Sequence, residues 1–149
     1  MDDAHWLQHA LQLAHKAQAQ GEVPVGAVLV DTAGHILGEG FNCPIATSDP
    51  TAHAEMVAIR AAAKTINNYR LLNTTLYVTL EPCMMCAGAI VHARIKRIVY
   101  GTRDPKAGAV GSICNIFELQ ALNHRVEYVA DGLVGPCSAI LKHFFRERR

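Results

Sequence analysis

Short runs of β-branched and aromatic residues alternate along this chain with longer segments of helical periodicity, and this alternation most limits its fold. Residues 25–30 and 75–80 have the composition of buried strands, whereas residues 4–20 place apolar side chains at helical spacing. A turn-forming segment at 31–34 links the first strand to a second one expected at 35–42, which predicts an antiparallel hairpin.

The alternation continues to the end of the chain. Helices are expected at 52–66, from Pro82 onward, and from 135 to the C-terminus, with further strands at 97–100 and 125–129 and a polar loop at 43–51. Strands that alternate with helices predict an α/β fold, in which one sheet, mostly parallel after the hairpin, carries helices on both faces. No repeat or linker is found, so we expect a single domain over residues 1–149.

Composition excludes several classes of protein. No apolar run reaches eighteen residues, and the N-terminus has neither a basic region nor an apolar core, so we expect no membrane span and no secretory signal. The five cysteines include only one closely spaced pair, which argues against a disulfide framework. We therefore expect a cytoplasmic protein, in which a Cys-x-x-Cys pair indicates metal or redox chemistry.

Three features carry the candidate chemistry: a His-Ala-Glu sequence at 53–55, a Pro-Cys-x-x-Cys sequence at 82–86, and Asn42 at the end of the second expected strand. Cysteines three positions apart share one face of a helix, and a helix N-terminus favours thiolates. Because zinc prefers four nitrogen and sulfur ligands and no second cysteine pair exists, His53 is the expected third ligand beside Cys83 and Cys86.

Three protein ligands would leave one position on the zinc for water, which is typical of a catalytic site. Glu55 lies only two residues from His53, so both can face one site only if His53 lies in or just before the first turn of its helix. A carboxylate beside zinc-activated water can shuttle protons, as hydrolytic deamination of an amidine carbon requires. The pattern is the one general to zinc-dependent base deaminases.

Each feature also has a simpler interpretation. The cysteine pair alone could be a redox pair or chance, His53 a polar residue near a helix start, and Glu55 a first-turn charge that favours the helix dipole. For each feature taken singly, the simpler interpretation is about as good as a role in a zinc site. The combination of the features in this order favours a zinc deaminase site.

Beyond these motifs, most of the chain resembles the bacterial tRNA-specific adenosine deaminases of the cytidine deaminase superfamily. The resembling segments are 22–30, 49–55, 68–71, 76–83, 85–89, 123–127 and 144–146. The resemblance implies a three-layer α/β/α cytidine-deaminase-like fold with a central mixed five-stranded sheet. It also implies a homodimer that hydrolytically deaminates adenosine to inosine at the wobble position of a tRNA anticodon, with one Zn²⁺ per chain.

The same resemblance assigns roles to individual positions. His53, Cys83 and Cys86 would hold zinc, and Glu55 would be the proton shuttle. Asn42 and the backbone of Ala54 would hold the flipped base. The remaining positions would contact the anticodon stem-loop, and they are Arg103, Asp104, Lys106, Arg146 and Arg148.

The basic C-terminus can be interpreted in two ways. Residues 142–149 carry four cations against one acid, although the net charge of the chain is only +1. Charge alone favours a solvated helix end, where cations suit the helix dipole. The resemblance shifts the interpretation toward contact with RNA phosphates.

Two other functions remain open. A deaminase of free guanine, cytosine or cytidine would share the zinc residues but would not need the basic helix or Arg103. A non-catalytic zinc module that binds RNA or a protein partner would have no need of Glu55.

Overall fold

The hairpin expected near the N-terminus forms one edge of a five-stranded sheet in the computed structural model, which describes residues 2–148. The elements, in chain order, are α1 (Asp3–Ala19), β1 (Gly26–Asp31), β2 (Ile36–Phe41), α2 (Pro44–Thr47), α3 (Ala54–Ile66), β3 (Thr74–Leu80), α4 (Met84–His92), β4 (Arg97–Thr102), the 3₁₀ helix η1 (Ile116–Glu118), β5 (Glu127–Val129) and α5 (Val134–Arg146).

The sheet is mixed, as expected. Its strand order is β2-β1-β3-β4-β5, in which β1 pairs antiparallel with β2 and β3, while β3, β4 and β5 run parallel. The parallel pairs require crossovers, and α4 provides the one between β3 and β4. The ends of β2, β3 and β4, together with the start of β1, consequently lie at the same edge of the sheet.

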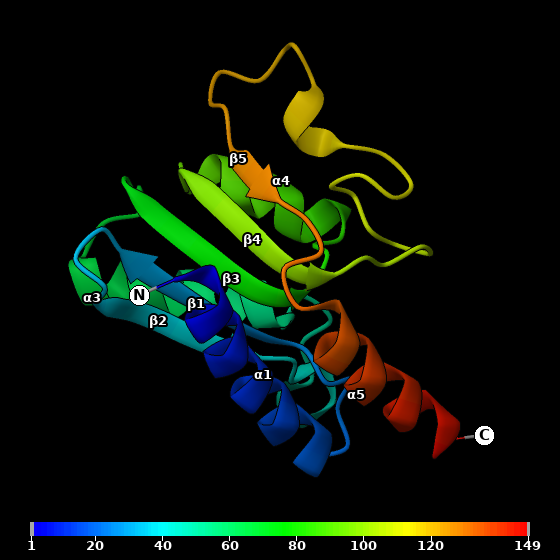
Figure 1. Cartoon of the computed structure of the whole chain (residues 1–149). Coiled ribbons are helices and arrows are strands. Elements are labelled where there is room, and N and C mark those ends of the chain that lie inside the picture. Colours follow the sequence, from blue (N-terminus) through cyan, green and yellow to red (C-terminus); the bar gives the residue numbers. More distant parts are fainter. Residues whose placement is uncertain (1, 149) are drawn as a thin grey trace.

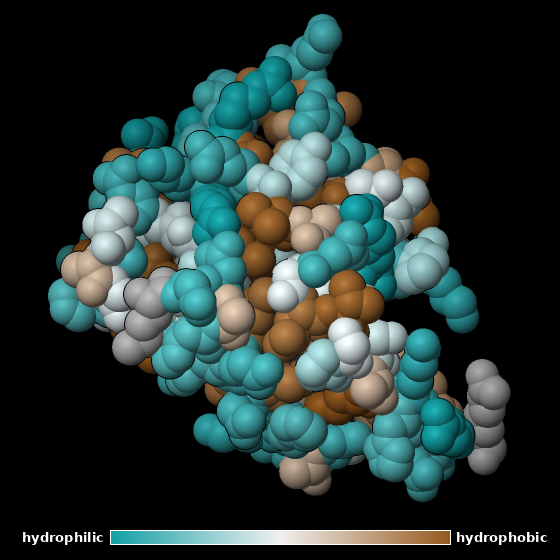
Figure 2. All heavy atoms as spheres, viewed as in Figure 1, coloured by the Kyte–Doolittle hydropathy of each residue, from teal (hydrophilic) through white to brown (hydrophobic). Residues whose placement is uncertain are grey.

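Helices cover both faces of the sheet, which confirms the predicted three layers. Helices α1 and α5 pack on one face, and α3 and α4 lie on the other (Figure 1). Strand alternation explains this arrangement, because Val28 and Val30 pack with α1, whereas Ala27 and Leu29 belong to the cluster that includes α3 and α4. In the same view, the outer side of α1 and the end of α5 are largely hydrophilic (Figure 2).

Helix α3 lies unusually close to β2 because small residues meet there. A Cβ atom added at Gly38 would lie 2.3 Å from the carbonyl oxygen of Ala58, and one added at Gly40 would lie 2.4 Å from that of Ala54. The two alanines are four positions apart and therefore lie on one face of α3. This close packing fixes the start of α3 beside the end of β2.

The structure differs from the sequence-based expectations at two helix starts and one loop. Pro82 does not open α4: the Glu81 N–H still donates to the Thr102 carbonyl (2.9 Å), so the chain remains extended and the helix begins at Met84. Helix α3 likewise begins at Ala54 rather than two residues earlier. The expected loop at 43–51 contains the short helix α2. Among residues 2–148, no helix has the length and apolar character needed to cross a membrane.

Candidate metal centre and adjoining groove

Three side chains from the starts of two helices meet at the end of the sheet where β2 and β3 end. The Nδ1 atom of His53 lies 3.6 Å from the Sγ atoms of both Cys83 and Cys86. With Zn–S bonds of about 2.3 Å and Zn–N bonds of about 2.0–2.1 Å, a tetrahedral ion separates a sulfur and a nitrogen ligand by roughly 3.6 Å. The three donors therefore fit a single ion of this kind, and in the described chain they form the one cluster with metal-ligand spacing.

The local backbone explains why these side chains are available. His53 and Cys83 are the N-cap residues of α3 and α4, with extended backbone angles, and neither side chain caps its own helix. An N-cap side chain ordinarily accepts a hydrogen bond from the first turn. Here both point instead at the candidate site, and Cys86 joins from the first turn of α4. The condition that His53 precede the first turn of its helix is thus met.

Glu55 lies in the first turn of α3 and is buried. Burial raises the pKa of its carboxyl to about 7, with a further increase from the Cys83 thiolate and an opposing effect of His53. Cys83, Cys86 and His53 are therefore the ionisable groups that face it. A carboxyl with a pKa near neutrality can both accept and release a proton under physiological conditions.

The two thiols differ in how readily they ionise. A hydrogen bond from the Cys86 thiol, together with others from His53 and the backbone, lowers the pKa of Cys83 to about 4. That same hydrogen bond, and then burial, raise the pKa of Cys86. The hydrogen bond to Cys83 raises the pKa of His53. The lowered pKa of Cys83 favours its thiolate, the form that binds metals.

Asn42 stands at the end of β2 and reaches the start of α3. Its side-chain Oδ1 atom accepts a hydrogen bond from the backbone N–H of Ala54 at 2.8 Å. The backbone N–H of Asn42 donates to the carbonyl of Val25. The Asn42 side chain therefore supplies the helix cap that His53 does not. The Ala54 N–H is consequently engaged with Asn42, and the two residues form one unit beside the cluster.

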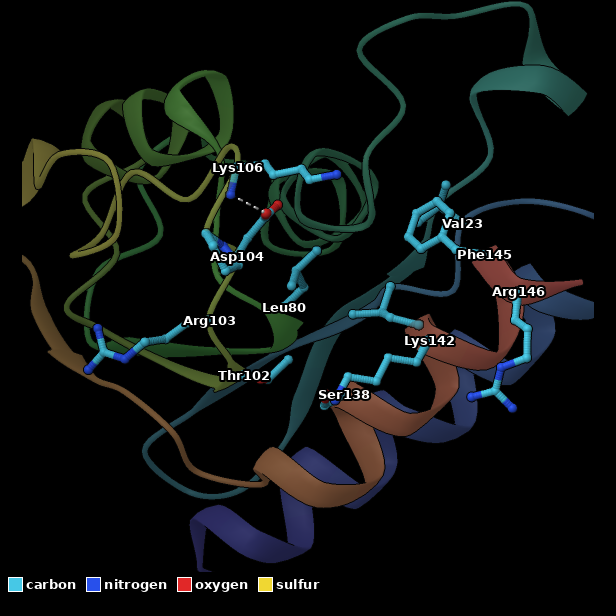
Figure 3. Close-up of a pocket in the computed structure, with 12 residues that line it drawn as sticks. Val23, Leu80, Thr102, Arg103, Asp104, Lys106, Ser138, Lys142, Phe145 and Arg146 are labelled. Atoms are coloured by element: carbon cyan, nitrogen blue, oxygen red, sulfur yellow. Dashed lines mark hydrogen bonds between the residues drawn. The ribbon is translucent and has the colours of Figure 1, made fainter. Parts of the chain in front are cut away.

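A groove of about 710 Å³ lies where β3 and β4 end (Figure 3). Its walls are the segment 102–106, which follows β4, and one side of α5, with Val23 and Leu80 between them. The residues that line the groove include no member of the candidate metal cluster. Glu55 and Asn42 do not line it either. The centre and the groove thus share no residue, although both lie at the end of the sheet where β3 ends.

The basic residues expected to bind RNA have different surroundings. Arg103 forms an ion pair with Asp131 (3.2 Å), and its guanidinium points away from α5 (Figure 3). Lys106 and Arg146 line the groove. Arg148 lies over the ring of Phe144, 3.7 Å from its centroid. Asp104 turns the chain locally, because its Oδ1 accepts from the N–H groups of Lys106 and Ala107.

Two buried carboxylates near the centre were not singled out from the sequence. Glu22 accepts hydrogen bonds from the N–H groups of Ile45 and Ala46 and so stabilises α2. Glu81 accepts bonds from Asp104 in the groove wall and from Val110 and Ser112 farther along the chain. The sequence signal for both was an acidic residue directly beside an apolar strand. Such a residue becomes buried with the strand, and a buried carboxylate requires hydrogen-bond partners.

Comparisons with known proteins agree on one family. The profile of the family described as MafB19-like deaminase matches residues 1–149. A tRNA-specific adenosine deaminase of Haemophilus influenzae is 57% identical over 147 residues, covering 99% of this chain and 85% of the relative. A solved structure from a study of A-to-I editing by tRNA:A34 deaminases at the wobble position of transfer RNA has a TM-score of 0.88 and is 41% identical, covering 92% of this chain and 99% of that one.

A solved guanine deaminase from Bacillus subtilis is also similar, with a TM-score of 0.67 and 33% identity, covering 99% of this chain and 95% of that one. The likeness thus extends to deaminases of free bases, but with lower identity and a poorer superposition than the tRNA:A34 deaminase structure.

Proposed function

This chain belongs to the tRNA-specific adenosine deaminases of the MafB19-like deaminase family, and we propose that it converts adenosine to inosine at the wobble position of a tRNA anticodon. The observation that carries the proposal is the 57% identity to a tRNA-specific adenosine deaminase over 99% of the chain. The geometry at the starts of α3 and α4 supports the chemistry.

The cofactor proposed here is one Zn²⁺ per chain, held by His53 Nδ1 and by the sulfurs of Cys83 and Cys86. The two thiolates and the imidazole are ligands that suit zinc, and their 3.6 Å separations suit a tetrahedral ion. When bound through three protein ligands, zinc supplies a Lewis acid that makes a water molecule acidic near neutral pH.

Glu55 is the proposed proton carrier. Deamination adds water to C6 of adenine, breaks the bond from C6 to the exocyclic nitrogen, and releases ammonia. The Glu55 carboxylate takes a proton from water as the new C6–O bond forms and delivers it to N1 of the ring. The carboxylate then takes the second proton of the former water and gives it to the departing nitrogen, so that Glu55 ends as it began. A pKa of about 7 suits both directions of transfer.

Asn42 is proposed to hold the base. Its Oδ1 atom is engaged with the Ala54 N–H, which fixes the plane of the amide and leaves the NH₂ group as the donor for an acceptor on the adenine edge. Ala54 would therefore act on the base through the orientation that it gives to Asn42.

The groove is the proposed site of the neighbouring anticodon nucleotides. It carries the cations Lys106, Lys142 and Arg146, and its wall includes the exposed ring of Phe145, a surface on which a base can stack. Arg103 and Asp104 also line it, whereas Arg148 lies over the Phe144 ring near the end of α5. The basic end of α5 would in this way contribute phosphate contacts.

We further propose that the protein works as a cytoplasmic homodimer. Ile66, Tyr69 and Leu72, at and after the end of α3, expose apolar surface that a second copy would cover. Sedimentation equilibrium would give twice the chain mass for the dimer, and a monomer at micromolar concentration would contradict it.

The deciding assay measures inosine in an anticodon stem-loop with adenosine at the wobble position, with free adenosine, cytidine and guanine tested in parallel. Inosine in the stem-loop alone would support the proposed function. Turnover of guanine without the stem-loop would replace it by the free-base activity to which the Bacillus subtilis likeness points.

A further inference from the structure

Glu81 is the most heavily hydrogen-bonded side chain near the site, and the proposed chemistry does not use it. It follows β3, is 2% exposed, and directly precedes Pro82 and Cys83. Its Oε1 atom accepts from the Asp104 N–H (3.1 Å) and the Ser112 hydroxyl, and its Oε2 accepts from the N–H groups of Val110 and Ser112, both at 3.0 Å.

These bonds close the segment 104–112 around one carboxylate. The Ala109 N–H adds a bond of 2.8 Å to the carbonyl of Pro82, the residue after Glu81. Gly108 passes directly over the carboxyl group, and a Cβ atom there would lie 2.3 Å from the Glu81 Cδ. The segment contains no helix or strand, and four of its backbone N–H groups have Glu81 or Pro82 as partners: those of Asp104, Ala109, Val110 and Ser112.

The position of Glu81 links the two parts of the site. Cys83 lies two residues after it, and the segment that it holds carries Asp104 and Lys106 in the wall of the groove. All four groups that contact the carboxylate are donors, so four acceptor positions are needed. A glutamine side chain offers one oxygen and turns an NH₂ group toward the remaining donors.

We propose that Glu81 is a positioning residue that fixes the substrate-binding segment 104–112 relative to the metal-holding start of α4, an inference that rests on the proposed function. Its carboxylate contacts no reacting atom. It acts through the backbone of the segment, and therefore on the binding of the stem-loop rather than on the proton transfers.

The test compares Glu81→Gln with the wild type in steady-state kinetics on the anticodon stem-loop. Because misplacing a binding segment by about 1 Å can lower a rate constant about 100-fold, we expect kcat/KM to fall about 10- to 100-fold, mainly through KM. Zinc content should remain at the wild-type level. Amide hydrogen exchange at 104–112 should accelerate, which reports the segment independently of activity.

Asp3→Asn is the matched control for lost stability. Asp3 pairs with Arg97 at 2.6 Å and accepts from the Tyr77 hydroxyl, and Arg97 begins β4 at the opposite sheet edge from Thr102. This variant should lower the Tm but leave KM and the exchange at 104–112 unchanged. Ser112→Ala, which removes only the hydroxyl bond, should raise KM about 3- to 10-fold and covers the case in which Glu81→Gln does not fold.

Three results would overturn the inference. They are an unchanged KM in both Glu81→Gln and Ser112→Ala, loss of zinc in Glu81→Gln, or a raised KM with faster exchange at 104–112 in Asp3→Asn. If the wild type itself leaves the stem-loop unmodified, the proposed function fails. Amide exchange still tests the inference in that case. If exchange at 104–112 is as slow in Glu81→Gln as in the wild type, the carboxylate does not hold the segment.

Discussion

The candidate metal centre and the groove both lie where β3 ends, but they are assembled in different ways. The centre is made of N-cap and first-turn residues of two helices, so short-range geometry sets most of it. The groove is made of an irregular segment and a helix that are about 40 residues apart in the chain, with a single buried carboxylate holding the irregular wall. We therefore expect the centre to control the chemical step and the groove to control binding.

Cys83→Ser should give the largest effect, because it removes one of the proposed zinc ligands. We expect loss of zinc, loss of deamination, and a Tm lower by roughly 5–15 °C, since the protein no longer gains stability from the bound ion. Metal analysis would measure the zinc content, and calorimetry would measure the Tm. Chelation of the wild-type zinc should reproduce the change in Tm, and zinc retained at one per chain in the variant would refute the ligand assignment.

Glu55→Ala separates the chemistry of the centre from its metal. We expect kcat to fall on the order of 10³–10⁴-fold through loss of the proton carrier, whereas zinc stays bound. Single-turnover rates and metal content measured on the same sample would distinguish the two effects. A variant with more than about a tenth of the wild-type kcat would contradict the role given to Glu55.

Reversing the charge of Arg146 and Arg148 tests whether the basic end of α5 contributes to binding. The double change to Glu should raise KM for the stem-loop about 10- to 100-fold at low salt and leave kcat nearly unchanged, because phosphate contacts supply binding. The dependence of KM on salt should weaken as well. Lys96→Glu, an exposed reversal at the opposite end of β4, is the control. Equal KM values in the two variants would remove the basic end of α5 from the interface.

Asp3→Asn should have the smallest effect and lies outside both regions. Hydrogen bonds from Arg97 lower the pKa of Asp3 below its usual 3.8, so its stabilising contribution is present above that pH and is lost as the pH falls through the lowered value. We expect a cost of about 1 kcal/mol at pH 7, because the pair is partly exposed. The Tm difference from wild type should vanish in acid; a difference that grows below pH 3.8 would be incompatible with this ion pair.

The helix and strand positions could be predicted because apolar periodicity is local, and the order of elements then required a mixed sheet with two helical layers. The position of Pro82 was misjudged because a proline suits both an extended strand end and a helix start. Only the pairing of Glu81 with Thr102 across β3 and β4 decides between them.

By itself, the sequence determined the donors that can hold a metal ion and the helices that carry them, since cysteine spacing and helix starts are short-range properties. Only the tertiary structure decided that Asn42 caps α3 through Ala54, that Asp131 pairs with Arg103, and that Glu81 holds the groove wall. Those contacts join residues between 12 and 31 positions apart. They depend on strand register and on the need of buried donors for acceptors, neither of which local spacing encodes.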